Sequence, residues 1–344
     1  MLPPADASAL LATTELLCRA DTTTGRENAG LPALRELLAA AGAEVTLQEV
    51  ENGRHNVLAT WGTPRLLFST HLDTVPPYIA PTLADGVLRG RGACDAKGQI
   101  TAQLAAIAAL RARGHDGFAW LGLVGEETDS IGATAAARFA PQLRSCIAAI
   151  NGEPTENRLA TGQRGSQQLR LMTRGVAAHS GTPELGRSAI WPLIDWLQRL
   201  RELPPRRDAD LGDEIWNLGL LRGGNAPNVI PAAAEAMLFV RTLPDSTFAA
   251  TARSLAPNDA LVEEVSASPP DHFTRLPGFP EAIVTFGSDA PRLRLFVGNG
   301  PVVLCGPGSI LVAHTADEHI TGDDLRAGVD LLVAIASELL ARGG

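Results

Sequence analysis

The sequence predicts an α/β protein in which helices sandwich a mixed, mostly parallel sheet and a smaller α+β domain is inserted. Three observations predict this class. Short apolar runs typical of buried strands alternate with helical patterns over the first part of the chain. Near Arg164 the pattern changes to alternating strand-like segments, and the main domain resumes near Asp271. A length of 344 residues also favours about two domains.

The main domain begins with helices and strands in alternation. Leu10, Leu11 and Leu17 give the opening segment an apolar side, and Gly42 and Gly114 follow two further helical patterns in the usual helix-stopping position. We expect helices at residues 6–19, 28–41, 99–113 and 131–139, and strands at residues 45–50, 56–61, 66–68, 118–124 and 146–150. The first two strands resemble a pair at the edge of a sheet. The overall order argues for a largely parallel sheet between helices.

The inserted segment has a different order of elements. Strand-like alternation at residues 167–174 is followed by a helical pattern at residues 188–203. Two further strands (215–221 and 235–241), a short helix (248–255) and a last strand (261–266) follow. The resulting β-α-β-β-α-β order is that of a ferredoxin-like domain. We therefore expect an inserted domain at residues 167–268, between the two parts of a main domain at residues 1–166 and 269–344.

Composition excludes several classes of protein. Apolar residues make up 45% of the chain and the mean hydropathy is +0.06, which provides a sizeable core and excludes a disordered chain. The longest apolar runs fall well short of the roughly 18 residues that span a bilayer. A net charge of −9 argues against nucleic acid or an anionic membrane as partner.

The N-terminal segment and the cysteines indicate a cytoplasmic protein. The first 21 residues are acidic and amphipathic and have no basic stretch before an apolar core, so we expect no signal peptide. Cys18, Cys94, Cys146 and Cys305 are dispersed and form no CxxC pair. This pattern is typical of reduced core thiols.

Two separated pieces of a candidate metal site lie between residues 66 and 98. His71 and Asp73 follow a buried strand, at the strand end where ligands bind in open α/β sheets. Asp95 lies further on, in a glycine-punctuated loop that precedes a helix. A histidine that binds metal usually donates its other ring N–H to a carboxylate, and Asp73 is well placed to accept it. The alternative is a surface histidine with two loop aspartates.

Further carboxylates and a second histidine follow other strand-like runs. Glu126 and Glu127 come after the run at residues 118–124, Glu153 after the run at 146–150, and His314 after a run at 302–305. Mixed imidazole and carboxylate ligands suit zinc and neighbouring divalent ions. These ligands exceed the needs of one tetrahedral ion. The excess indicates two metals that share a bridging aspartate, with one carboxylate left over as a base.

At these residues the chain resembles a known family. The motifs HLDTVP, GRGACDAKG, GEE, GEPT, AHSG, NVIP and AHTADE occur in the family's order and span nearly the whole chain. The family is that of the dizinc amidohydrolases, which includes acetylornithine deacetylase, succinyl-diaminopimelate desuccinylase, aminoacylases and related carboxypeptidases. The resemblance implies a zinc-peptidase-like fold, two zinc or cobalt ions, and an inserted domain that acts as lid and homodimer contact.

The resemblance also implies residue roles. One metal would be held by His71, Asp95 and Glu153, and the other by Asp95, Glu127 and His314, with Asp73 as the supporting carboxylate and Glu126 as the general base that activates the attacking water. From the inserted domain, His179 and Asn228 would polarise the scissile carbonyl. Arg241 would hold the carboxylate of the substrate, to which its planar guanidinium is suited.

Several substrates stay open at this point. The motif HLDTVP and the segment GPGSILVAHTADEHI favour an acetylornithine deacetylase of arginine biosynthesis, acting on a small N-acyl amino acid. The alternatives are succinyl-diaminopimelate, acetylcitrulline, an amino acid bound to a carrier protein, or a peptide cleaved by a dipeptidase or carboxypeptidase. A non-catalytic binding homologue is the remaining alternative, although every expected metal ligand is present.

Overall fold

The computed structural model describes residues 6–342 and divides the chain into two compact units. The first comprises Met1–Thr161, Phe273–Ala282 and Ser288–Gly344, and the second comprises Gly162–His272 and Ile283–Gly287. The first five residues of the N-terminal segment, on which the expectation of no signal peptide partly rests, lie outside the described residues. Within residues 6–342, no helix is long and apolar enough to cross a membrane.

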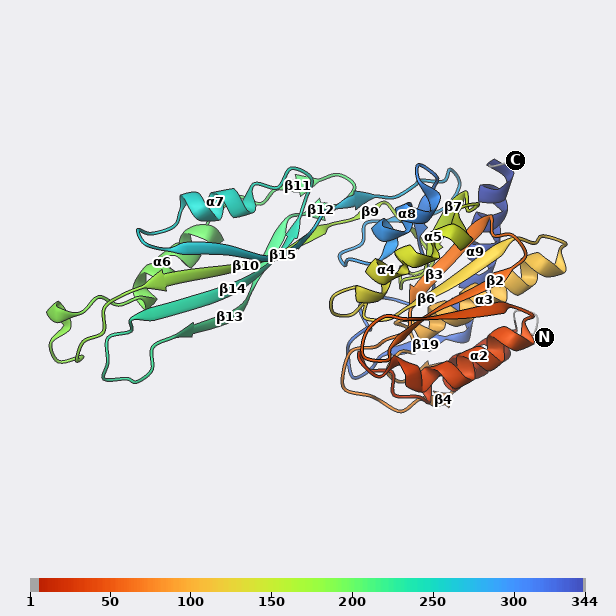
Figure 1. The fold of residues 1–344 in the computed structure, drawn as a ribbon, viewed down its shortest axis with the longest axis horizontal. Helices are drawn as coiled ribbons and strands as arrows, with labels where there is room; N and C mark the ends of the chain where they lie inside the picture. The colour runs from red at the N-terminus through yellow and green to blue at the C-terminus, as the bar shows by residue number, and fades with distance from the viewer. Residues whose placement is uncertain (1–5, 343–344) are drawn as a thin grey trace. The chain divides into compact units, whose positions relative to one another are not determined.

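A six-stranded sheet forms the centre of the first unit (Figure 1). Its order is β1 (Glu44–Glu49), β2 (His55–Trp61), β6 (Phe118–Leu123), β3 (Leu66–His71), β7 (Ala148–Asn151) and β18 (Val302–Leu304). The last four strands are parallel, and β1 and β2 form an antiparallel pair at one edge. The predicted fold class, with its mostly parallel sheet, is therefore confirmed.

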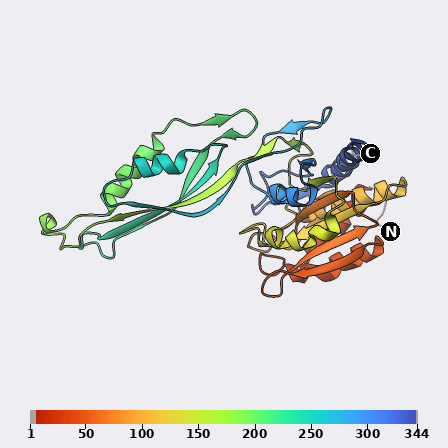
Figure 2. The same cartoon turned by 45° about the horizontal axis from the view of Figure 1, so that its top comes forward.

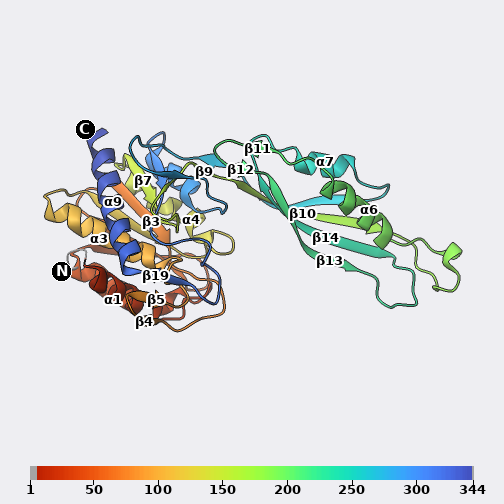
Figure 3. The same cartoon turned by 180° about the vertical axis from the view of Figure 1, so that it is seen from behind.

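Helices cover both faces of this sheet. On one face, α3 (Lys97–Ala112) packs against α9 (Gly322–Arg342), and both contact α1 (Ala7–Cys18) (Figure 3). On the other face lie α4 (Ile131–Ala135), η2 (Ala136–Phe139), α5 (Ala140–Leu143), η4 (Ala290–Leu293) and α8 (Arg294–Val297) (Figure 1). The helix expected at residues 28–41 is instead a 3₁₀ turn, η1 (Glu27–Gly30), followed by the shorter helix α2 (Leu31–Ala40). Pro32 lies in the first turn of α2, where a proline is well accommodated.

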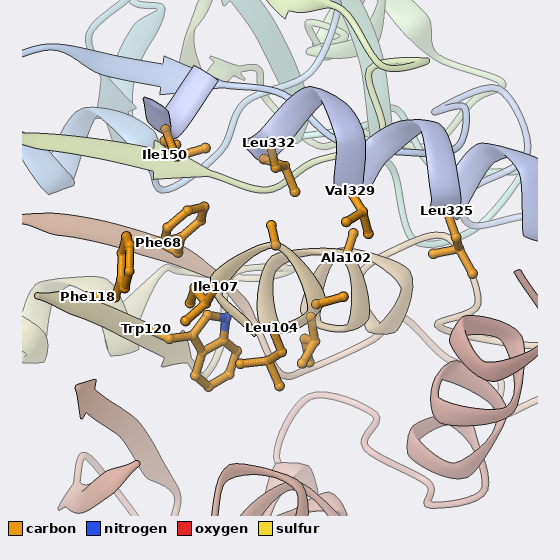
Figure 4. Packing of buried hydrophobic residues seen from close by; sticks show 14 of the residues in the cluster. Phe68, Ala102, Leu104, Ile107, Phe118, Trp120, Ile150, Leu325, Val329 and Leu332 are labelled. Atoms are coloured by element: carbon orange, nitrogen blue, oxygen red, sulfur yellow. The ribbon is translucent and has the colours of Figure 1, made fainter. Parts of the chain in front are cut away.

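The core of the first unit lies between the sheet and α3 and α9 (Figure 4). Phe68, Phe118 and Trp120 project from the strands toward side chains of α3. Residues Leu325, Val329 and Leu332 of α9 form a helical stripe that covers the same cluster. Each such side chain contributes roughly 1.5–3 kcal/mol on burial.

Three short strands form a separate sheet in the order β19 (His319–Thr321), β5 (Val87–Arg89) and β4 (Thr82–Ala84). Both pairings are antiparallel. These strands are not predictable from the sequence, because runs of three residues are too short to show a period. They join the segment just before Asp95 to the segment just after His314.

The second unit has the predicted β-α-β-β-α-β order. Its sheet has the order β13 (Ile215–Gly223), β14 (Ala233–Thr242), β10 (Gly165–Arg174) and β15 (Leu261–Ser268). Both α6 (Ile190–Arg201) and α7 (Phe248–Ser254) cover one face of this sheet (Figure 2). The indole N–H of Trp196 donates to the carbonyl of Ala252 at 2.9 Å, which joins the two helices.

Smaller elements complete the chain. They are the parallel pair β8 (Leu159–Ala160) and β17 (Glu281–Ala282), the antiparallel pairs β9 (Gly162–Gln163) with β16 (Asp271–His272) and β11 (Arg207–Asp208) with β12 (Gly212–Asp213), and the turn η3 (Pro183–Leu185). All four cysteines are free and buried, as the sequence predicts.

Candidate metal centre

The predicted metal ligands of the first unit gather at the carboxyl ends of its parallel strands. His71 is the last residue of β3, and Glu126 and Glu127 follow β6. Glu153 follows β7, and His314 lies in the loop between β18 and β19. Parallel strands present their carboxyl ends at one edge, so side chains far apart in sequence become neighbours there.

Asp95 lies between the two histidines. Its Oδ1 is 2.8 Å from Nε2 of His71, and its Oδ2 is 3.3 Å from Nε2 of His314. One carboxylate therefore faces two imidazoles with different oxygens. Asp95 is almost fully buried, in the loop that leads into α3 through a cis peptide bond between Asp95 and Ala96.

Glu127 completes the cluster. Its carboxylate is 3.1 Å from Nε2 of His314. Single ligand atoms of His71, Asp95 and Glu127 all lie within 4.8 Å of one another. Imidazole nitrogens and carboxylate oxygens in such proximity form a donor set that fits zinc and similar divalent ions.

Asp73 holds the loop that carries the two glutamates. Its Oδ1 accepts a hydrogen bond from the backbone N–H of Glu126 at 3.1 Å, and its Oδ2 accepts from the N–H of Glu127 at 3.2 Å. A third bond comes from the hydroxyl of Thr24 at 2.9 Å. The ring Nδ1 of His71 is 3.0 Å from the backbone carbonyl oxygen of Asp73 and 3.5 Å from its carboxylate. Asp73 thus supports both His71 and the glutamate pair.

Glu126 and Glu153 bring two further carboxyl groups to this edge. Burial raises the pKa of both carboxyls well above the usual range, and neighbouring carboxylates add to the rise. For Glu126 these neighbours include Asp289, a buried residue that precedes η4. The Nδ2 of Asn151 lies 3.4 Å from Oε1 of Glu153. Clustered carboxylates of this kind are costly to ionise together unless a cation lies among them.

The neighbouring carboxylates raise the pKa of both histidines of this site. Burial opposes protonation of His71, but Asp73 and Asp95 hold its pKa well above the ordinary value. Hydrogen bonds to Asp95 and Glu127 raise the pKa of His314 to about 10. In the absence of metal, a proton on each ring therefore serves as the counter-charge. A divalent cation can take over this function, which supports the fit of the site to metal.

Two buried residues with no predicted role, Arg91 and Glu318, lie behind Asp95. Their side chains form an ion pair with 2.6 Å between Arg91 Nη1 and Glu318 Oε2. Both residues belong to motifs quoted from the sequence, GRGACDAKG and AHTADE. Their pairing depends on the β5–β19 contact, which the sequence does not reveal. Glu318 lies four residues after His314, and this closeness in sequence is the one signal that could have drawn attention to it.

Two of the remaining predicted residues, His179 and Asn228, lie together in the second unit. Their segments pair in antiparallel fashion, with the N–H of Ser180 donating to the carbonyl of Asn228 at 3.0 Å. The N–H of Gly181 donates to Nδ1 of His179 at 3.0 Å. Because Nδ1 is an acceptor, neutral His179 carries its proton on Nε2. Its exposed ring is thus a hydrogen-bond donor.

Arg241 lies near the other end of the same sheet. It pairs with Ser166 near the start of β10. The opposite end of the same strand pairing is Arg174 with Ala233, and the chain continues from Arg174 to His179. The eight steps along the strand from Ser166 to Arg174 span about 27 Å at roughly 3.4 Å per residue. The guanidinium of Arg241 lies 4.8 Å from the ring centre of Phe239. Within one chain the structure therefore does not bring Arg241 and His179 together.

The fold and the site define a metal-dependent hydrolase: a mostly parallel sheet presents two histidines and several carboxylates at one edge. Comparison with known proteins agrees. The family model described as peptidase family M20/M25/M40 matches residues 67–338. A protein of Aspergillus clavatus, named as a probable carboxypeptidase, is 35% identical over 87% of this chain and 81% of its own length.

Two solved structures share the fold. A tripeptidase from Staphylococcus aureus has a TM-score of 0.80 at 22% identity, over 98% of this chain and 99% of that chain. A Bacillus subtilis protein described as a dinuclear metal-binding peptidase has a TM-score of 0.69 at 13% identity, over 96% and 98% of the two chains. The chain belongs to peptidase family M20/M25/M40. It is a metallopeptidase of that family, an enzyme that hydrolyses amide or peptide bonds.

Proposed function

We propose that the enzyme uses two divalent metal ions, with zinc expected and cobalt as an alternative, to cleave the amide bond of a small substrate that carries a free carboxylate. The observation that carries this proposal is the position of Asp95, which directs one oxygen to His71 and the other to His314. A carboxylate held in this way is suited to bridging two ions.

Each ion would have its own ligands besides the bridge. One would be held by His71, Asp95 and Glu153, and the other by Asp95, Glu127 and His314. When bound, the ions lower the pKa of a water molecule and polarise the amide carbonyl. The group formed by His71, Asp95 and Glu127 contains the proposed bridge and one proposed ligand of each ion, which supports two ions close together.

Glu126 is the proposed general base. It would take a proton from the attacking water and deliver it to the leaving amine nitrogen. Two features support the role: its backbone is fixed by Asp73, and burial raises its pKa. A base is most effective when its pKa lies near the working pH, and a partly buried glutamate such as Glu126 approaches that condition more closely than a fully exposed one.

The second unit would supply groups that bind the substrate. Nε2–H of His179, with Asn228 beside it, would stabilise the negative charge that develops on the carbonyl oxygen, an effect often worth about 10²–10³ in rate per donor. Arg241 would bind the substrate carboxylate. The hydrogen bond from Gly181 to Nδ1 supports this role for His179, because it leaves Nε2 as the donor.

These roles favour a homodimer formed through the inserted domain, residues 167–268. His179 and Arg241 lie at opposite ends of one sheet, so both can serve one active site only if they come from different copies. Strand β13 supports the same proposal: it is an edge strand and exposes Ile215, Leu220 and Leu221. Exposed apolar edge strands are suited to pairing with a second chain. The buried free cysteines fit a cytoplasmic location.

We favour a peptide as the substrate, cleaved by a carboxypeptidase or dipeptidase activity, because relatives named as carboxypeptidases are 31–36% identical. A second candidate is an acetylornithine-type deacetylase of arginine biosynthesis. It is favoured by the motif HLDTVP and the segment GPGSILVAHTADEHI. Both reactions cleave an amide bond next to a free carboxylate, and they differ in the group on the other side of that bond.

Metal content and substrate preference test the proposal together. Metals per chain are measured by mass spectrometry, and amine release is measured with dipeptides, their C-terminal amides, acetylornithine and succinyl-diaminopimelate. Two metals with cleavage of free dipeptides but not of their amides would support the peptidase; faster acetylornithine turnover would support the second candidate. Two metals without turnover would retain the site and redirect the search to other acyl amino acids. A protein that takes up no metal would overturn the mechanism.

A further inference from the structure

Glu318 accepts hydrogen bonds from the backbone of the loop that carries Asp95. Its Oε1 accepts three hydrogen bonds, from the N–H groups of Gly92 (2.9 Å), Asp95 (3.1 Å) and Cys94 (3.2 Å). The side chain of Glu318 is 1% exposed. Bonds from N–H groups to an ionised carboxylate are stronger than neutral ones, and the position of the Asp95 backbone is therefore set by one carboxylate oxygen.

The other oxygen of Glu318 connects this loop to a second one. Oε2 accepts from Nη1 of Arg91 at 2.6 Å, and the same nitrogen also donates to the carbonyl of Thr315 at 3.2 Å. Thr315 is the neighbour of His314. Arg91 further donates from Nε to the carbonyl of Pro77 at 3.2 Å. The pair Arg91–Glu318 thus lies between the segments that carry Asp95 and His314.

We propose that Glu318, held by Arg91, is a positioning residue that fixes the Asp95 and His314 ligands relative to each other and so sets the metal affinity of the centre. This inference rests on the proposed function, since it assumes that these two residues bind metal. Glu318 contacts the backbone of one ligand and, through Arg91, the backbone beside the other. It is not itself a proposed ligand.

The effect on metal binding follows from the shared position of Asp95. As the proposed bridge it would serve both ions, so a shift of its backbone would weaken both sites together. Residues that support metal ligands from behind typically change metal affinity 10–100-fold when substituted. A residue with a merely structural role would instead lower the stability of the fold and leave the metal affinity of the folded protein unchanged.

The test is Glu318→Gln, which keeps the size of the side chain, removes its charge and places an amide N–H₂ next to Arg91. The affinities of the 344-residue chain for zinc are measured by competition with a chromophoric chelator. The melting temperature of the metal-free protein is recorded in parallel. We expect a 10–100-fold loss of affinity for both ions. Affinities within twofold of wild type in folded Glu318→Gln would overturn the inference.

Glu214→Gln in the second unit is the matched control. Glu214 also accepts a backbone N–H, from Leu243 at 3.2 Å, and lies 3.9 Å from Nη1 of Arg206. This variant should keep wild-type zinc affinity whatever it does to the melting temperature. A loss of affinity equal to that of Glu318→Gln would mean that general destabilisation explains both results, and would overturn the inference.

Arg91→Lys decides the matter if Glu318→Gln does not fold. A lysine keeps a cation for Glu318 but cannot reproduce the fork that also contacts Thr315 and Pro77. We expect at least a several-fold loss of zinc affinity, and unchanged affinity would overturn the inference. Wild-type protein that binds no metal would overturn the proposed function as well, whereas metal-loaded wild type with unaffected variants overturns this inference alone.

Discussion

At the scale of the residue, neighbouring side chains in this centre have different surroundings. Glu127 directs its carboxylate to His314 at 3.1 Å. Glu126, the preceding residue, has no hydrogen bond to either histidine among those found in residues 6–342, and burial raises its pKa. One short loop, fixed by Asp73, thus carries the proposed metal ligand Glu127 and the proposed base Glu126 side by side.

Substitution of these two glutamates should separate the roles. Glu126→Gln should lower turnover by about 10²–10⁴, the usual contribution of a general base, while the metal content stays at the wild-type level. Glu127→Gln is the control and should lose metal as well as activity. Steady-state kinetics and metal analysis of the same preparations provide the measurement. Glu126→Gln protein with near wild-type turnover would show that another group is the base.

At the scale of the element, the metal centre depends on packing behind the sheet. Helix α3 begins at Lys97, directly after the Asp95 loop, and is buried along most of its length. Helix α9 packs against α3 and places Leu332 in the shared core, where it is 1% exposed. The position of the Asp95 loop is thus coupled to a helix pair that carries none of the proposed metal ligands.

Leu332→Ala should therefore destabilise the fold without a change in chemistry. Removal of a fully buried leucine side chain costs about 2–5 kcal/mol in the free energy of unfolding, because a cavity remains. Urea denaturation monitored by tryptophan fluorescence measures this loss. Arg326→Ala on the exposed side of α9 is the control and should stay within about 0.5 kcal/mol of wild type. Equal effects of the two substitutions would contradict the packing described for α9.

At the scale of the whole molecule, protons and the proposed metal ions would compete for the same side chains. The pKa of His314 is raised from 6.5 to about 10 by Asp95 and Glu127. Protonated His314 therefore contributes stability to the metal-free fold that is fully present below pH 6.5 and is lost as the pH rises to about 10. A histidine must be neutral to bind metal, so a metal ion bound at His314 would displace this proton.

The melting temperature of the chelator-treated protein should consequently fall between pH 6.5 and 10 more steeply than that of the zinc-loaded protein. Differential scanning calorimetry across this range measures both curves. Metal-free His314→Gln should lack the part of the decline that belongs to this residue. If metal-free wild type and His314→Gln decline in parallel, the raised pKa does not describe His314.

The sequence predicts those features that depend on local pattern. The apolar runs before His71, Glu126 and Glu153 indicate strands, and parallel strands bring their carboxyl ends together, which is why the gathering of ligands is predictable. The support of Asp95 by Glu318 is not predictable from the sequence, because it depends on pairing between β5 and β19, two strands of three residues each. The separation of Arg241 from His179 also requires the register of β10 and β14, which residue types do not reveal.

The insertion of the second unit divides the first unit into separate stretches of chain. His71, Asp95, Glu126, Glu127 and Glu153 precede the insertion, and His314 and Glu318 follow it. Strand β18, which pairs with β7 at one edge of the sheet, also follows it. During synthesis from the N-terminus, the ribosome must therefore translate the whole inserted domain before β18, His314 and Glu318 are made. A nascent chain that ends within the insertion has five of the site's side chains but lacks His314 and Glu318, so the site is incomplete.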